Sequence, residues 1–158
     1  MLAMSVQRLT HLGLCVSHLE RSLAFYEEVL GFQEVGRFSG DGEPSASLVE
    51  LRDLQLRAIY LERDGWRLEL LHFPSPGSIG TGERRPMNLL GLTHLSFRVA
   101  DLDAVLAAVE SHGGQVLKHT CLDSGTGVRA IFALDPDGTR LELIEGPGDP
   151  NAIPGSGR

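Results

Sequence analysis

Two short patterns occur twice in the chain, and each copy carries a side chain that could bind a metal ion. The pattern Asp-Gly-x-Arg-Leu-Glu-Leu contains Glu69 in its first copy and Glu142, 73 residues later, in its second. The triplet Thr-His-Leu contains His11 and, 83 residues later, His94. Imidazole nitrogens and carboxylate oxygens are common ligands of divalent transition metals. The sequence therefore indicates one His and Glu set that is present in two copies.

The alternation of apolar residues predicts which way these four side chains face. Apolar residues alternate along four strand-like segments: Leu12, Leu14 and Val16; Leu68 and Leu70; Leu95, Phe97 and Val99; Leu141 and Leu143. These apolar sets must face the covering helices, and successive side chains of a strand point to opposite faces. His11 and Glu69 are therefore expected on the other face. The same argument places His94 and Glu142 there, so that all four converge on one hollow.

A hollow with two imidazoles and two carboxylates favours a bound cation. Left unpaired in a half-apolar cavity, such groups would each cost roughly several kcal/mol. A divalent cation cancels two negative charges and accepts the imidazole lone pairs, and mixed nitrogen and oxygen ligands suit Zn, Ni, Co, Mn or Fe. Four protein ligands in an octahedral site leave two positions for water or substrate. We therefore expect a divalent metal ion in a catalytic arrangement, held by His11, Glu69, His94 and Glu142.

The repeated patterns lie in two modules with the same order of predicted elements. In module one we predict a strand at 8–16, a helix from near Ser17 to Gly31, and strands at 32–38, 55–62 and 66–73. In module two we predict a strand at 92–99, a helix at 102–112 capped by Asp101, and strands near 115–121, 127–134 and 139–145. One βαβββ unit cannot bury both faces of its sheet. We therefore predict an α+β fold in which two tandem βαβββ modules form an eight-stranded curved sheet around a metal cavity.

The chain is expected to form one domain over residues 1–158. Its predicted parts are module one at 8–74, a linker at 75–91, module two at 92–146 and a flexible tail at 147–158. The linker and the tail are rich in Gly and Pro, which is typical of connecting segments. Module one has ten more residues than module two between its His and its Glu, and an insertion at 40–54, with a short helix within 46–54, would account for them.

Composition narrows the class of partner and the compartment. A net charge of −7, without a basic cluster, argues against nucleic acid or an anionic membrane as the partner. The two cysteines, Cys15 and Cys121, form no disulfide framework, so we expect reduced thiols. The first five residues lack a signal-peptide pattern, and no apolar run approaches the roughly 20 residues of a membrane span. We expect a cytoplasmic protein that acts on a small molecule.

Further motifs carry a resemblance to a known family. These are the early strand histidine, the Phe-Tyr-x-x-x-Leu-Gly helix end at 25–31, and the closing Asp-Pro-Asp-Gly-x-x-Leu-Glu-Leu at 135–143. Over residues 8–146 the chain resembles the vicinal oxygen chelate superfamily, which includes glyoxalase I, methylmalonyl-CoA epimerase, extradiol dioxygenases, and bleomycin and fosfomycin resistance proteins. In that family the metal ligands lie on the first and fourth strands of each module. The resemblance thus implies the same four ligands.

The complete set of four ligands is most similar to that of glyoxalase I-like members. It implies a metal-dependent lyase or isomerase that transfers a proton next to a metal-chelated carbonyl, with Glu142 and Glu69 as candidate bases. Three alternatives stay open: an extradiol-type ring-cleaving dioxygenase, a CoA-thioester epimerase and a non-catalytic antibiotic-binding resistance protein. Modules of this superfamily pair within one chain or between chains, which leads us to expect a homodimer.

Two equivalent positions of the modules bear on how a substrate anion could bind. Bacterial glyoxalase I has an Arg four residues after the first His, where it binds a glutathione carboxylate, and this chain has Cys15 there. The corresponding position of module two is Arg98, which could bind a substrate carboxylate or phosphate, or could pair with a structural carboxylate. Arg67 and Arg140 are expected to pair with neighbouring acids. The other histidines are expected to be structural or solvated: His18, His72, His112 and His119.

Overall fold

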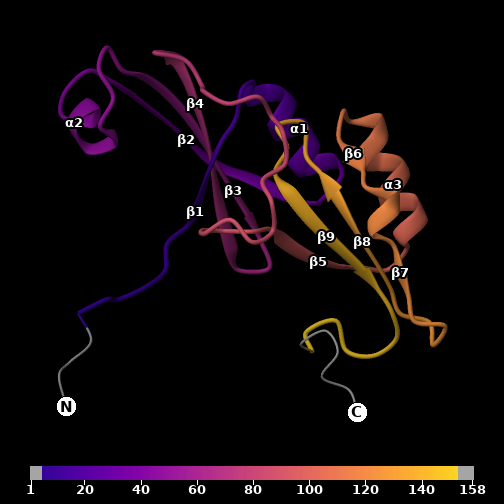
Figure 1. Cartoon of the computed structure of the whole chain (residues 1–158). Helices are drawn as coiled ribbons and strands as arrows, with labels where there is room; N and C mark the ends of the chain where they lie inside the picture. Colours follow the sequence, from indigo (N-terminus) through magenta and orange to yellow (C-terminus); the bar gives the residue numbers. More distant parts are fainter. Residues whose placement is uncertain (1–4, 153–158) are drawn as a thin grey trace. The chain divides into compact units, whose positions relative to one another are not determined.

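The computed structural model describes residues 5–152, in which the chain forms two compact units (Figure 1). Unit one comprises the chain up to Leu23 together with Gly31–Ile79, and unit two comprises Ala24–Leu30 and the chain from Gly80 onward. Each unit has its own mixed sheet, and helices are few, so the predicted α+β class is confirmed. Residues 1–4, and residues 153–158 at the end of the predicted flexible tail, lie outside the described residues.

Unit one contains a four-stranded sheet. Its elements are β1 (Leu12–Cys15), α1 (Leu19–Glu28, of which the last residues count with unit two), β2 (Gln33–Asp41), α2 (Ser45–Val49), β3 (Gln55–Arg63) and β4 (Trp66–Ser75). The strand order is β1-β4-β3-β2, with β1 parallel to β4 and the other neighbours antiparallel. The short helix predicted within 46–54 is confirmed by α2, and it follows β2 as an addition that unit two lacks among its described elements.

Unit two repeats the same topology. Its elements are β5 (Leu95–Val99), α3 (Leu102–Ser111), β6 (Gln115–Val116), the 3-10 turn η1 (Lys118–Thr120), β7 (Leu122–Asp123), β8 (Arg129–Leu134) and β9 (Arg140–Glu145). The order β5-β9-β8-β6 matches that of unit one, β5 is parallel to β9, and β7 pairs with β8. Asp101 caps α3, as predicted, because its carboxylate accepts a hydrogen bond from the Ala104 backbone N–H at 2.9 Å.

The second strand predicted for module two, near 115–121, is replaced by two short strands, β6 and β7, with η1 between them. The Thr120 hydroxyl donates to the Leu117 carbonyl at 2.7 Å and accepts from the Phe132 backbone N–H at 3.0 Å. A side chain that bonds to the backbone in this way competes with the sheet ladder. The described part of the chain therefore has nine strands in two sheets, where the sequence predicted eight.

The apolar residues that define the strand faces are buried on β4 and β9, as predicted, and half-buried on β1 and β5. Leu68 and Leu70 on β4 are 2% and 0% exposed, and Leu141 and Leu143 on β9 are both 0% exposed. Burying a leucine side chain stabilises a fold by roughly 2 kcal/mol. This burial determines which face of β4 and β9 is left for polar side chains.

The turn before β9 is built around a buried carboxylate. Asp135, 3% exposed, accepts hydrogen bonds from the backbone N–H groups of Asp137 at 3.0 Å and Thr139 at 2.7 Å. The phenol of Tyr26, itself fully buried, donates to Asp135 at 2.9 Å. Burial raises the pKa of the Asp135 carboxyl above its ordinary value, while the accepted hydrogen bonds lower it. The turn is thus fixed before the strand that carries Glu142 begins.

Gly138 in this turn meets the linker segment. Its φ of 88° lies in the left-handed region, and a Cβ atom at this position would collide with the backbone of Gly82. Further along the segment, the Arg85 carbonyl accepts a hydrogen bond from Arg140 Nη2 at 2.8 Å. Part of the predicted linker is therefore packed against unit two.

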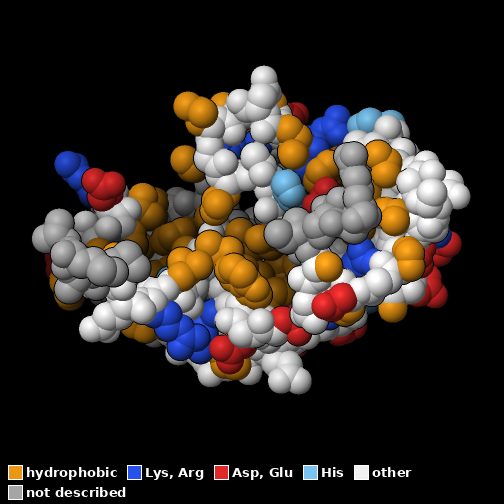
Figure 2. All heavy atoms as spheres, turned by 90° about the horizontal axis from the view of Figure 1, so that it is seen from below, with side chains coloured by type: hydrophobic (Ala, Val, Ile, Leu, Met, Phe, Trp, Pro, Cys, Tyr) orange, Lys and Arg blue, Asp and Glu red, His pale blue; other side chains and the backbone are white. Residues whose placement is uncertain are grey.

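Surface charges are largely paired within each unit. Arg37 contacts Glu20 at 2.8 Å and Glu34 at 2.9 Å, and Arg57 contacts Asp41 at 2.6 Å. Figure 2 shows basic and acidic side chains close together at several places on one face. Exposed pairs of this kind contribute little to stability. No helix within residues 5–152 combines the length and the apolar character that crossing a membrane requires.

We expect Gly138→Ala to lower the free energy of unfolding by about 2–4 kcal/mol, because the new methyl group adds left-handed strain to a backbone clash. Urea denaturation measures this loss. Gly125 is the matched control, since its φ is 68° and nothing lies within 4 Å of a Cβ there. Gly125→Ala should cost only about 1 kcal/mol. Equal losses in the two variants would contradict the clash.

His112, which follows α3, contacts the end of α1. Its Nε2 lies 2.8 Å from Glu28 Oε2, and its Nδ1 lies 2.8 Å from the Ala108 carbonyl. The hydrogen bond to Glu28 is the main cause that raises the pKa of His112 above its ordinary value of 6.5. A histidine with a raised pKa in the folded state stabilises that state fully below its unfolded pKa. This contribution is lost as pH rises through the folded-state pKa.

Glu28→Gln should return the pKa of His112 towards 6.5, and it should remove the stabilisation that the wild type shows below that pH. An NMR titration of the His112 ring protons, with denaturation curves at pH 5.5 and pH 8, measures both effects. Glu110→Gln changes the same charge on α3 and is the control. A titration of His112 that is unchanged in Glu28→Gln would disprove the interaction.

Candidate functional site

In unit one the structure brings His11 and Glu69 together. The parallel pairing of β1 with β4 places Gly13 opposite Glu69, and His11 lies two residues before Gly13, on the same side. His11 Nε2 is 3.1 Å from Glu69 Oε2. The glutamate side chain is 12% exposed and the histidine side chain 35%. The pair is therefore partly screened from water.

Unit two has the equivalent pair, His94 and Glu142. Here β5 runs parallel to β9, Ser96 lies opposite Glu142, and His94 lies two residues before Ser96. His94 Nε2 is 3.5 Å from Glu142 Oε2. Within residues 5–152 no group of three or more His, Cys, Asp or Glu side chains is close enough to hold a metal ion. Each unit by itself thus supplies one imidazole and one carboxylate.

A threonine contacts the other ring nitrogen of each histidine. The Thr10 hydroxyl lies 3.1 Å from His11 Nδ1, and the Thr93 hydroxyl lies 2.9 Å from His94 Nδ1. A partner on Nδ1 fixes the orientation of the ring and leaves Nε2 for another contact. The threonine of the repeated Thr-His-Leu triplet therefore has a physical role in both copies.

An aromatic ring completes each pair, and sequence reasoning missed both rings. Tyr60 lies opposite Glu69 across β3 and β4, and Phe132 lies opposite Glu142 across β8 and β9. Edge-on ring contacts join His11 to Tyr60 and His94 to Phe132, with centroids 5.6 Å and 5.5 Å apart. Both aromatic residues precede an Asp-Gly turn at a similar distance. Counting back across each hairpin from the glutamate would have found them.

Sequence reasoning also missed the hydroxyl partner of each carboxylate. Tyr60 lies directly opposite Glu69 in the β3–β4 pairing, and hydrogen bonding to that carboxylate is the main cause that raises the pKa of Tyr60 to about 12. In unit two the Ser96 hydroxyl donates to Glu142 Oε2 at 2.7 Å. Each glutamate therefore has a residue with a hydroxyl group opposite it on a neighbouring strand.

The two strand arginines differ between the units. Arg67 contacts Glu62 at 3.2 Å, so its predicted pairing with a neighbouring acid is confirmed. Arg140 lies opposite Leu134, which offers no charge, and its guanidinium carbon lies 5.3 Å from the Phe132 ring centroid. Together with the bond to the Arg85 carbonyl, this cation–π contact replaces the ion pair predicted for Arg140.

Arg98 stands on the same side of β5 as Ser96, two residues away. Its Nη2 donates to the carbonyl oxygens of Gly146 at 2.6 Å and Pro147 at 2.7 Å. These contacts are with backbone rather than with the structural carboxylate considered as an alternative. They leave the N–H groups on Nε and Nη1 as the ones that a substrate anion would take.

Residues 8–143 match the family model of the Glyoxalase/Bleomycin resistance protein/Dioxygenase superfamily. The chain belongs to this superfamily. The resemblance drawn from the sequence, on the early histidine, the helix end at 25–31 and the closing motif at 135–143, is therefore confirmed. The superfamily includes enzymes such as lactoylglutathione lyase.

Two curated relatives resemble nearly the whole chain. YwkD, an uncharacterized protein of Bacillus subtilis (strain 168), is 33% identical over 142 residues, which are 90% of this chain and 99% of YwkD. A lactoylglutathione lyase of Neisseria meningitidis serogroup A is 32% identical over 140 residues, which are 87% of this chain and 90% of that enzyme.

Solved structures of the superfamily show the same fold. A glyoxalase family protein from Bacillus cereus superposes with a TM-score of 0.79 at 22% identity. The matched part is 94% of this chain and 99% of the Bacillus cereus protein. The fosfomycin resistance protein FosX of Listeria monocytogenes, solved with Mn(II) and sulfate, has a TM-score of 0.57 at 16% identity and covers 90% of this chain and 94% of its own. That structure of FosX thus combines the same fold with a divalent metal ion.

The donor spacing in this superfamily member suits a metal ion. With metal–ligand distances of about 2.1 Å, adjacent donor atoms are about 3.0 Å apart in an octahedron and about 3.4 Å apart in a tetrahedron. The His11–Glu69 and His94–Glu142 contacts, at 3.1 Å and 3.5 Å, are close to these values. The nitrogen and oxygen donors of each pair therefore fit neighbouring positions around one cation.

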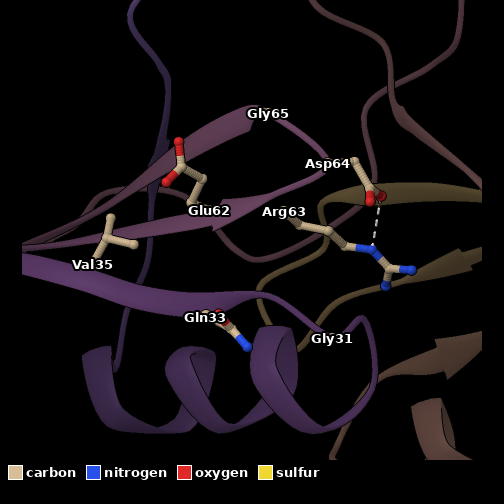
Figure 3. A pocket seen from close by; sticks show the side chains of 7 residues that line it. All are labelled: Gly31, Gln33, Val35, Glu62, Arg63, Asp64 and Gly65. Carbon is tan, nitrogen blue, oxygen red and sulfur yellow. Dashed lines mark hydrogen bonds and ion pairs between the residues drawn. The ribbon is translucent and has the colours of Figure 1, made fainter.

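Two of the hollows that open on unit one involve the turn between β3 and β4. One, of ≈ 550 Å³, lies at the β3–β4 turn and is lined by Gly31, Gln33, Val35, Glu62, Arg63, Asp64 and Gly65 (Figure 3). In it Arg63 contacts Asp64 at 3.0 Å, and no predicted ligand takes part. The other, of ≈ 210 Å³, is lined by residues 8–12 and 65–67 and includes His11. The smaller hollow is the one that adjoins the His11–Glu69 pair.

Proposed function

We propose that the chain is a metal-dependent lyase or isomerase of the glyoxalase type, which moves a proton next to a carbonyl group of a small substrate. The observation that carries this proposal is the His and Glu contact that both units repeat, each with its threonine and aromatic partners. The similarity to a lactoylglutathione lyase over 87% of the chain supports the same class of reaction.

The proposed ligands of a divalent Zn, Ni, Co, Mn or Fe ion are His11, Glu69, His94 and Glu142. Two neutral imidazoles and two carboxylates balance the charge of a divalent cation and match its preference for nitrogen and oxygen. When bound, the cation would supply Lewis acidity beside the substrate carbonyl, which lowers the cost of removing the neighbouring proton.

The protein groups then have separate tasks. Glu142 and Glu69 are the proposed bases, since a carboxylate oxygen within hydrogen-bond reach of the substrate carbon can accept its proton and return it one atom away. Arg98 is the proposed contact for a substrate carboxylate or phosphate. The aromatic rings of Tyr60 and Phe132 limit access of water to the imidazole edges.

We further propose that the protein works in the cytoplasm as a homodimer. A sequence with two cysteines and no C-x-x-C pair suits a reducing compartment. The resemblance to the superfamily supports the dimer, because modules of that superfamily can pair between two chains as well as within one chain.

We expect His94→Ala and Glu142→Ala each to weaken metal binding at least about 10-fold, since each removes one donor of the set. Elemental analysis after loading with Ni²⁺ or Zn²⁺ and dialysis measures occupancy, and circular dichroism checks that the fold is kept. His119→Ala removes an imidazole outside the set and is the control. Full occupancy in both ligand variants would rule out the assignment.

The reaction is tested with the metal-loaded protein and the hemithioacetal of methylglyoxal and glutathione, with thioester formation as the readout. Glu142→Gln keeps an oxygen ligand but removes the base, so it should lower kcat at least about 100-fold. Oxygen uptake with a catechol would favour the dioxygenase alternative. Deuterium exchange at the α-carbon of a CoA thioester, without thioester formation from the hemithioacetal, would favour the epimerase.

A further inference from the structure

The hydroxyl partners of the two glutamates come from different strands. In unit one the hydroxyl-bearing residue opposite Glu69 is Tyr60, on β3, and in unit two the Ser96 hydroxyl, on β5, donates to Glu142. The first lies on the hairpin side of its glutamate, and the second lies on the side of the parallel strand. The repeat is therefore symmetric in its imidazoles and carboxylates but not in these donors.

Each of these two hydroxyl groups is absent from the equivalent position of the other unit. The position that matches Ser96 in unit one is Gly13, which has no side chain, and the position that matches Tyr60 in unit two is Phe132, which has no hydroxyl. Each glutamate thus faces one place that supplies a hydroxyl and one place that does not. Each carboxylate therefore has one hydroxyl group beside it, and the strand that supplies this hydroxyl differs between the two units.

We propose that Tyr60 and Ser96 are the positioning residues of Glu69 and Glu142. A carboxylate has two oxygen atoms and turns readily about its last side-chain bond. A hydrogen bond to one oxygen stops that rotation and directs the other oxygen to its ligand or substrate. This inference rests on the proposed function, in which Glu69 and Glu142 are ligands and bases.

The contacts of each donor suit this task. The Tyr60 ring is held edge-on to His11, and Tyr60 lies directly opposite Glu69 in the antiparallel β3–β4 pairing. Ser96 lies directly opposite Glu142 in the parallel ladder, and its short side chain reaches Oε2 at 2.7 Å. Both donors thus depend on strand register rather than on loops.

The test measures the affinity of the metal-free protein for Ni²⁺ alone by calorimetry. Tyr60→Phe and Ser96→Ala should each weaken binding roughly 10- to 100-fold, as the loss of a partner behind a metal ligand does. Ser39→Ala, on β2, removes a hydroxyl elsewhere and should bind as the wild type does. Urea denaturation of all variants separates loss of positioning from loss of fold.

Transplanting the donor tests the role more sharply. Gly13→Ser in the Tyr60→Phe background places a hydroxyl where Ser96 lies in unit two, and a Cβ there meets only the end of the Leu71 side chain at 3.2 Å. Phe132→Tyr in the Ser96→Ala background is the converse exchange. Each second substitution should restore most of the lost affinity. A structural role in the strand alone predicts no such rescue.

Crystal structures of metal-free Tyr60→Phe and Ser96→Ala give a readout that does not need a metal. The carboxylate of Glu69 or Glu142 should be rotated away from its wild-type position. Wild-type protein that binds no Ni²⁺, with rotated carboxylates in the variants, would refute the proposed function and support positioning. Tight binding by the wild type and by both variants, with carboxylates in place, would overturn the positioning role alone.

Discussion

The parallel pairing of the first strand of each unit with its last strand is the constraint on which the candidate site depends. In a parallel ladder the register fixes which residues lie side by side, and the pleat fixes the face on which they appear. Leu68 and Leu141 are buried on one face, so Glu69 and Glu142 must appear on the other. A shift of one residue would bury the carboxylates and expose the leucines. The hydrophobic effect therefore holds a polar site in place.

The two units differ in the groups that contact the arginine and the glutamate of the last strand. Arg67 is neutralised by Glu62, whereas Arg140 stacks on Phe132 and is held by a backbone carbonyl. The hydroxyl group beside Glu69 is the phenol of Tyr60, whereas Glu142 accepts a hydrogen bond from the Ser96 hydroxyl. Duplication with later divergence explains such a pattern, because the donor atoms near the imidazoles are kept while the groups behind them vary.

Much of the fold, and the pairing of each histidine with its glutamate within a unit, could be predicted from the sequence, because both follow from local rules. Alternation gave the faces of the strands, and the Asp-Gly turns and Asp101 marked element ends. Tyr60 and Ser96 were missed because their contacts depend on cross-strand register, which a single strand does not encode. The break at η1 was missed because one hydroxyl, that of Thr120, decides it. The departure of Arg140 from the predicted ion pair came from its uncharged partner, Leu134.

The bond between Tyr26 and Asp135 joins positions 109 residues apart along the chain. Tyr26 belongs to Ala24–Leu30, a segment that counts with unit two although it is made long before the rest of that unit. During synthesis this bond can form only after the Asp-Pro-Asp-Gly turn has been made. A polypeptide that began at Gly80 would lack Tyr26, so the second half of the chain alone does not contain the whole of unit two.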